Sequence, residues 1–316
     1  MIFDYTAACG LLGGLRRGSL KEEMIEKIKK DGSSIKEFLK SYLEEDYPPQ
    51  EGNEYFERAL YISFIKKIGK LLKFLGSEAE EVVKTLLYEF DILNLKLLIR
   101  KIELKREVGV EMFYWGGPYL TFKDKCPSSF KDIDELQHYL RRAPLLRKIF
   151  LKSFDDFKFH KEIFYFDIRL DKEYFSLLRK KSFGLERDAS QLVDYFITIK
   201  LLIYALRLKF FQGRDLREIR TNLGSLPLIN DNVFSQVLNA SSLEEALSVI
   251  EKSSSFLKFK AKFPLNFEEG MEGFFYHHFL RRRGINFFSI YPYLSFYLNQ
   301  RYFIEKMVFI INDRLT

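Results

Sequence analysis

Cysteine, proline and glycine are scarce in this sequence, and each scarcity narrows the classes of protein that it can encode. Only 2 Cys, 8 Pro and 17 Gly occur among 316 residues. Cys9 and Cys126 form no CxxC motif and lack the spacing of metal ligands, which favours a reducing compartment. Leu, Lys and Glu dominate instead, and these side chains lose little freedom in a helix. The composition therefore favours helical structure.

Long apolar runs are also missing. The longest uncharged stretch, Gly284 to Gln300, is interrupted by polar residues and falls short of the about 20 residues that a membrane-spanning helix needs. The N-terminus carries Asp4 and has no basic segment followed by a continuous apolar one, so no signal peptide is expected. The sequence thus predicts a cytoplasmic protein that meets a membrane only through other proteins.

The charge and the aromatic content of the chain indicate which kinds of molecule it binds. The net charge is +7, but the 51 basic and 44 acidic residues are interleaved along the chain. A nucleic-acid-binding protein more often carries its basic residues in a clustered stripe, so a solvated surface of mixed charge is the favoured interpretation. The 33 Phe and 18 Tyr exceed what a catalytic site could use. They indicate core packing and surfaces reserved for protein partners.

Helical periodicity recurs along nearly the whole chain, and strand-like alternation is almost absent, so the predicted fold class is all-α. Ser77 with Glu80 three residues later forms a capping-box pattern. Pro144 is predicted to begin a helix at its first turn. The other predicted helices cover residues 21–30, 35–43, 55–75, 77–105, 129–140, 155–181 (one helix or a bent pair), 186–211, 215–220, 231–238, 243–250, 267–283 and 290–314.

Motifs for nucleotide or metal binding do not reach the required pattern. Gly13 to Ser19 has two glycines at the P-loop interval, but Ser19 stands where Lys must contact the phosphates, and no apolar strand precedes it. His277 and His278 are adjacent and point about 100° apart on a helix, so they cannot hold one metal ion together. No cofactor and no metal are expected.

Paired acids and nucleophiles give no catalytic site either. Asp167 and Asp171 share a helix face, but Arg169 and Lys172 lie among them, which indicates surface ion pairs and not a desolvated acid and base. No Ser or Cys stands in a recognisable nucleophile elbow. The sequence predicts a protein that is not an enzyme.

The densest basic patch is Arg281, Arg282 and Arg283, which Gly284 follows. Cations are favoured at the C-terminal end of a helix by the helix dipole and the unpaired carbonyls, and this is the simpler interpretation. Contact with an anion or an acidic partner is the alternative, so the three arginines are interface candidates.

The most informative segment is a helix that carries polar residues beside an apolar stripe. Asp91 and Asn94 lie three residues apart at the edge of that stripe, where they would be partly desolvated and would need partners from a neighbouring helix. Arg100, nine residues after Asp91, points the opposite way and is not their partner within the helix. The stripe consists of Val83, Leu86, Leu87, Phe90, Leu93, Leu97 and Ile102.

Similar pieces recur about a hundred residues apart. Glu305 is followed nine residues later by Arg314 with apolar residues between them, and Thr198 stands nine residues before Arg207. The recurrence suggests a threefold repeat. We predict a first repeat over residues 1–110, a second over 111–213 and a third over 214–316.

These residues carry a resemblance to a known family. It rests on Asp91, Asn94, Leu95 and Arg100, on a long helix at 194–211 after the segment 165–181, and on Pro292, Tyr297, Leu298 and Glu305 near the C-terminus. Over roughly residues 55–314 the chain resembles the C-type subunit of archaeal and bacterial V-type (A-type) ATPases, which is equivalent to the d-type subunit of the eukaryotic V-ATPase. Two positions depart from the pattern, because Ile197 and Val308 stand where Asn is expected.

The resemblance implies a funnel of three similar helical repeats around a pseudo-threefold axis. One end would rest on the membrane proteolipid ring, and the socket would receive the central shaft subunits of the D and F type. Such a subunit transmits torque for proton or sodium transport, binds no nucleotide, and lies at the inner face of the membrane. In this role Asp91 and Asn94 would tie repeats together, and the arginines at 281–283 would meet acidic loops. An all-helical scaffold and a nucleic-acid-binding protein are the alternatives.

Overall fold

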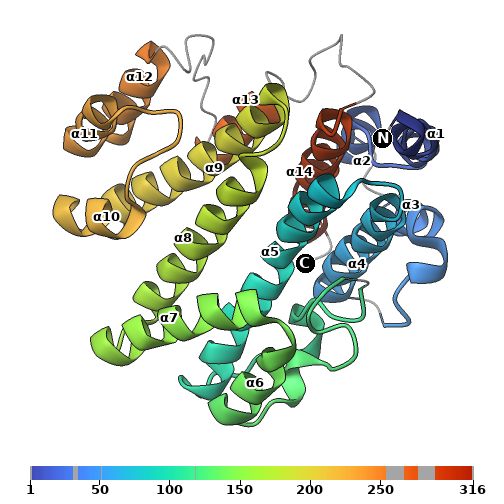
Figure 1. Cartoon of the computed structure of the whole chain (residues 1–316), viewed down its shortest axis with the longest axis horizontal. Coiled ribbons are helices and arrows are strands. Elements are labelled where there is room, and N and C mark those ends of the chain that lie inside the picture. The colour runs from blue at the N-terminus through green and yellow to red at the C-terminus, as the bar shows by residue number, and fades with distance from the viewer. Residues whose placement is uncertain are drawn as a thin grey trace. The chain divides into compact units, whose positions relative to one another are not determined.

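The computed structural model describes residues 2–30, 35–50, 52–117, 119–253, 267–276 and 289–314. The chain divides into two compact units. The first comprises Met1–Lys181 and Asn286–Thr316, and the second comprises Ser182–Ile285. Figure 1 shows their helices, coloured from the N-terminus to the C-terminus.

The first unit consists of α-helices and a few short 3-10 turns. The helices are α1 (Ile2–Arg17), α2 (Glu22–Lys30), α3 (Ile35–Leu43), α4 (Asn53–Leu72), α5 (Ser77–Ile102), α6 (Ile133–Tyr139), α7 (Pro144–His160), α8 (Ile163–Ser182) and α14 (Tyr291–Arg314). The 3-10 turns are η2 (Glu44–Asp46), η3 (Val110–Met112), η4 (Pro127–Ser129) and η5 (Leu140–Arg142).

The second unit is built around one long helix. Its elements are α9 (Arg187–Leu206), the π-helical turn η6 (Arg207–Phe211), α10 (Leu216–Leu223), α11 (Asp231–Asn239), α12 (Leu243–Lys252) and α13 (Phe267–Phe275). Helix α9 contacts α10 and α13, and α11 packs against α12.

The all-α class is confirmed. The described residues contain no strand, and their only β-type pairing is an isolated bridge between Leu226 and Ile229. Several helices begin where a short polar side chain accepts a hydrogen bond from the first turn, as Asp132, Asp215 and Ser242 do. These caps satisfy backbone N–H groups that have no partner inside the helix.

Several expectations about helix ends need correction. Ser77 does not cap α5: it is the first helical residue, Gly76 occupies the cap position, and no side chain caps the helix. Of the two alternatives for the segment 155–181, the pair of helices is the one observed: α7 ends where Lys161 adopts a left-handed conformation (φ 60°), and α8 follows. Helix α7 begins at Pro144, as predicted. Helix α1 was not predicted.

The core of the first unit lies where α4, α5 and α14 meet. Helix α14 packs against both α4 and α2. Tyr297 of α14 is fully buried, its ring centroid lies 5.1 Å from that of Phe64 on α4, and its hydroxyl donates to the carbonyl of Leu86 on α5 (3.0 Å). Burial of such large aromatic side chains supplies much of the apolar area that stabilises a fold.

Helix α5 is buried on more sides than the predicted stripe. Leu95 and Leu98 are fully buried although the stripe omits them, whereas Leu93 and Leu97 are only half-buried. A helix enclosed by neighbours on several faces has no single apolar stripe, so the periodicity identified too narrow a face.

Helix α9 with η6, Arg187–Phe211, is the one helix within the described residues that is long and apolar enough to cross a membrane. Its most apolar window has a mean hydropathy of 1.4, and 67% of that window is buried inside the protein. The core helix of a soluble protein has the same properties, so this helix is weak evidence for a membrane span.

Candidate functional site

Asn94 of α5 holds the loop that follows the helix. Its Nδ2 donates to the carbonyl of Tyr114 (2.5 Å), and its Oδ1 accepts from the Tyr114 N–H (2.9 Å). The Asn94 side chain is completely buried. Both backbone groups of a buried loop residue are therefore satisfied by one amide, which removes the cost of burying them unpaired.

Asp91 holds the same loop one turn earlier. The N–H of Thr121 donates to both carboxylate oxygens (3.2 and 3.1 Å), and the side chain is fully buried. Burial raises the pKa of Asp91 to about 7, although hydrogen bonds from Thr121 and Phe122 oppose the shift. The expectation of partners on a neighbouring helix was wrong for Asp91 and Asn94, because both side chains bind backbone groups of the loop over residues 113–122.

Two ion pairs join α5 to α8. Arg100 donates to both carboxylate oxygens of Asp167 (3.2 Å from Nη1 to Oδ1), and Lys96 lies 2.6 Å from Asp171. Burial raises the pKa of Asp167 in spite of the Arg100 guanidinium. Both acids form ion pairs, as predicted, but the partners Arg100 and Lys96 come from α5 and the pairs are largely buried instead of lying at the surface. Arg100 does not pair with Asp91 or Asn94, as predicted.

Glu305 belongs to an ion-pair chain between α14 and α5. Arg301 lies 2.8 Å from Glu305 and donates through two nitrogens to Glu89 of α5 (2.8 Å from Nε to Oε2). The side chains of Arg301 and Glu89 are only 13% and 14% exposed. A two-pronged Arg–carboxylate contact fixes orientation as well as distance, so it sets the register of α14 against α5.

Arg207 lies in the second unit. It pairs through two nitrogens with Glu268 of α13, and this contact raises the pKa of Arg207. Lys200, two turns before Arg207, pairs with Glu272, which stands one turn after Glu268 in α13. Arg281, Arg282 and Arg283, with His277 and His278, lie outside the described residues.

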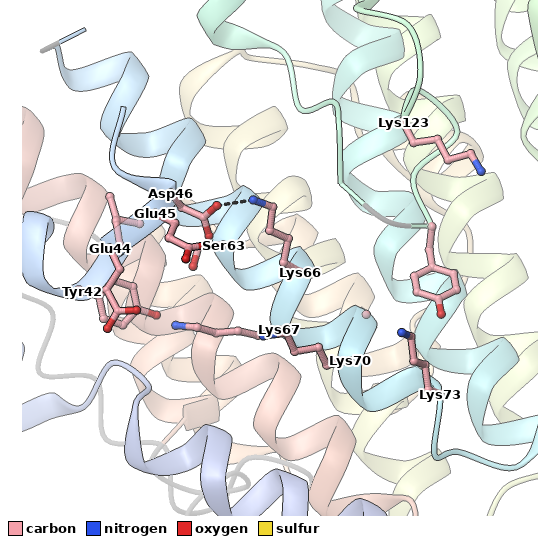
Figure 2. Close-up of a pocket in the computed structure, with 13 residues that line it drawn as sticks. Tyr42, Glu44, Glu45, Asp46, Ser63, Lys66, Lys67, Lys70, Lys73 and Lys123 are labelled. Atoms are coloured by element: carbon pink, nitrogen blue, oxygen red, sulfur yellow. Dashed lines mark hydrogen bonds and ion pairs between the residues drawn. The ribbon is translucent and has the colours of Figure 1, made fainter. Parts of the chain in front are cut away.

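A groove beside α4 was not anticipated from the sequence. It has a volume of about 860 Å³ and lies between η2, α4 and the loop after α5. Figure 2 shows an acidic side, which includes Asp46, and a row of lysines on α4 with Lys123 beyond it. Lys66 pairs with Asp46, and the ammonium of Lys67 lies 4.1 Å from the ring centre of Tyr42. The acidic side consists of Glu44, Glu45 and Asp46, and the lysines are Lys66, Lys67, Lys70, Lys73 and Lys123.

A second, smaller pocket of about 350 Å³ lies against α5. Leu93 and Leu97 line it together with Met112 of η3, which is 45% exposed. The two leucines are half-buried because they line this pocket instead of facing another helix.

The polar contacts described above tie helices and a loop of the first unit together. Within the part of the chain that the structure describes, no group of three or more His, Cys, Asp or Glu residues could hold a metal ion. The buried Asp91 accepts hydrogen bonds from a backbone donor, and the half-buried Asp167 accepts them from Arg100. The acids that stand out in the sequence therefore take part in contacts that fix α5 to the following loop and to α8.

The chain matches the family described as ATP synthase (C/AC39) subunit over residues 8–312, and it belongs to that family. Membership implies a role within a rotary ATPase complex, which is associated with a membrane. No match was found among curated proteins.

Proposed function

We propose that this chain is a non-catalytic coupling subunit in the central stalk of a rotary V/A-type ATPase. It joins the shaft subunits of the D and F type to the membrane proteolipid ring, turns with them, and transmits torque for proton or sodium transport. It lies on the cytoplasmic side, peripheral to the membrane, and meets the membrane through other subunits. The family match over residues 8–312 carries this proposal.

The polar ties support a role in transmitting force. The pairs between Arg100 and Asp167 and between Arg301 and Glu89 are largely buried, and they join α5 to α8 and to α14. Separating such a pair leaves a poorly solvated charge, which costs about 3–5 kcal/mol for a fully buried pair. Helices tied in this way resist sliding past one another under load.

The ties also connect the three predicted repeats. Asn94 and Asp91 belong to residues 1–110 and hold backbone groups within 111–213, as does the pair between Arg100 and Asp167. The pair between Arg301 and Glu89 joins residues of the third and first repeats. These ties all lie within the first unit, and the funnel of three similar repeats that the resemblance implies stays part of this proposal.

Co-purification tests the role directly. A tagged chain expressed in its own cells, in detergent-solubilised membranes, is expected to retain the proteolipid ring and the shaft subunits. A helical protein of similar size with the same tag serves as the control bait. Recovery of the tagged chain without either set of partners would show that the coupling role is wrong and would favour a helical scaffold.

Transport gives a functional test. Membrane vesicles that lack the chain are expected to show no ATP-driven ion gradient, and adding the purified chain is expected to restore it. Equal gradients with and without the chain would contradict a coupling role. Titration with DNA and RNA at low salt addresses the nucleic-acid alternative, which predicts affinity that falls steeply as salt is raised.

A further inference from the structure

Within the described residues, the lysine charges of the groove beside α4 are paired with acidic side chains at one end only. At one end Lys66 pairs with Asp46. At the other end Lys70, Lys73 and Lys123 are all exposed, and none of the three has an ion-pair partner within the described ranges. We call these three residues the lysine end. A concentration of uncompensated positive charge in a groove attracts an anionic group.

The spacing of the lysines favours an extended ligand. Lys66 and Lys70 of α4 and Lys73 at its C-cap stand at positions i, i+4 and i+7, so they lie on one side of the helix. Seven residues of helix span about 10 Å. Because Asp46 already pairs with Lys66, a ligand meets uncompensated charge at Lys70 and Lys73 and, from a different segment, at Lys123. A polypeptide segment can present several carboxylates to such separate positions. The residues that line the groove include no Arg, the side chain best suited to two-pronged phosphate binding.

The side of the groove that carries Lys123 is already ordered without a ligand. Lys123 follows a loop that α5 holds at two points, at Tyr114 through Asn94 and at Thr121 through Asp91. Between those anchors Tyr119, which lines the groove, adopts a left-handed backbone conformation (φ 69°) that is uncommon for a residue with a large side chain. A preformed wall lowers the entropy cost of binding, because the loop need not order when the ligand arrives.

We propose that this groove binds an acidic segment of a protein partner, with its carboxylates against the lysine end. Glu44 and Glu45 stand on the opposite side of the groove and repel carboxylates, so they set which way the segment lies (Figure 2). The dipole of α4 favours Lys70 in its last turn and Lys73 at its C-cap. It does not account for Lys123, which comes from a different segment.

A synthetic peptide tests the groove with the isolated chain. The probe is a fluorescein-labelled helical peptide of about 15 residues whose Glu residues recur at i, i+4 and i+7. The same peptide with Gln in place of Glu is its control. Fluorescence anisotropy at low ionic strength is expected to show binding of the Glu peptide only, with affinity that weakens as salt is raised.

Charge reversal at the lysine end provides the decisive comparison. The double variant Lys70→Glu/Lys73→Glu is expected to weaken binding about tenfold or more, because two attractive contacts become repulsive. Lys27→Glu/Lys30→Glu is the matched control, since these exposed lysines have the same spacing and also stand at the C-terminal end of a helix, α2. It changes the net charge equally and is expected to alter affinity less than about twofold.

Circular dichroism establishes whether each variant folds, and the milder Lys70→Gln/Lys73→Gln replaces the charge-reversal variant if that one does not. No binding of the Glu peptide to the wild-type chain would overturn the proposal. Equal losses in the two double variants would do so as well, because they would indicate a general charge effect. So would stronger competition by tripolyphosphate or by vesicles of anionic lipid than by unlabelled Glu peptide. The assay needs no ATPase assembly, so its outcome is separate from that of the coupling role.

Discussion

The substitution Asp91→Asn removes the titratable carboxyl group of a buried side chain while it keeps the size and shape of that side chain. Asp91 is fully buried and binds the backbone of Thr121, and burial raises its pKa from 3.8 to about 7. The folded chain therefore holds this proton more tightly than the unfolded chain. Stability from protonated Asp91 is fully present below pH 3.8 and is lost as the pH rises through about 7.

The size of the effect follows from the shift. A difference of about three pKa units corresponds to about 4 kcal/mol between the limiting protonation states. Over the accessible range from pH 5 to pH 8, linkage predicts that the contribution of Asp91 to the free energy of unfolding falls by about 2.5 kcal/mol. Asn cannot titrate, so the variant lacks this component of the pH dependence.

Urea unfolding followed by circular dichroism measures the effect. The stability of the wild-type chain minus that of Asp91→Asn is expected to fall steadily between pH 5 and pH 8, while other titrating groups cancel because both chains contain them. Asp134→Asn, on an exposed position of α6, is the control for the loss of one formal charge. If this difference changes by less than about 1 kcal/mol between pH 5 and pH 8, the pKa of Asp91 in the folded chain is not raised as argued.

Two further predictions concern the ties of α5. Asn94→Ala is expected to lower the free energy of unfolding by about 2–4 kcal/mol, because it leaves the N–H and C=O of Tyr114 buried without partners; urea unfolding checks this, and a cost below about 1 kcal/mol would contradict it. Arg100→Met is expected to cost about 2 kcal/mol, reduced from the value for a fully buried pair because the side chain is 27% exposed. A double-mutant cycle with Asp167→Leu is expected to recover part of that cost, and strictly additive costs would argue against coupling.

The helical class and many helix positions could be predicted because their signals are local. Pro144 begins α7, and the predicted helix at 35–43 matches α3. Such features depend on a residue and its near neighbours in sequence. The false capping box at Ser77 shows the limit, because the same residue type is compatible with the cap or with the first helical position.

The partners of the polar residues could not be predicted because they depend on tertiary contacts. Sequence placed Asp91 and Asn94 at the edge of a buried face, which correctly indicated that they need partners, but the partners lie 20 to 30 residues away in a loop without periodicity. Asp167 and Asp171 stand beside basic residues in sequence, yet their four-residue spacing matches that of Lys96 and Arg100 on α5. Only the packing of α5 on α8 distinguishes these pairings.

The groove beside α4 depends both on a local sequence pattern and on tertiary contacts. The spacing of Lys66, Lys70 and Lys73 is visible in the sequence, but it is equally typical of a solvated helix face. Lys123 joins them only because α5 fixes the preceding loop. Which of many surface lysines gather at one place is therefore information that the fold supplies.

Helix α5 connects the parts of the first unit, and this arrangement gives the coupling role a mechanical consequence. Packed apolar helices can slide by small shear movements, whereas a two-pronged Arg–carboxylate contact fixes one register. Arg301 makes such a contact with Glu89. In assembled vesicles, Arg301→Lys, which keeps the charge but loses the two-pronged geometry, is expected to lower ion transport relative to ATP hydrolysis. Equal losses of transport and hydrolysis would indicate faulty assembly and contradict a role for this register in transmitting torque.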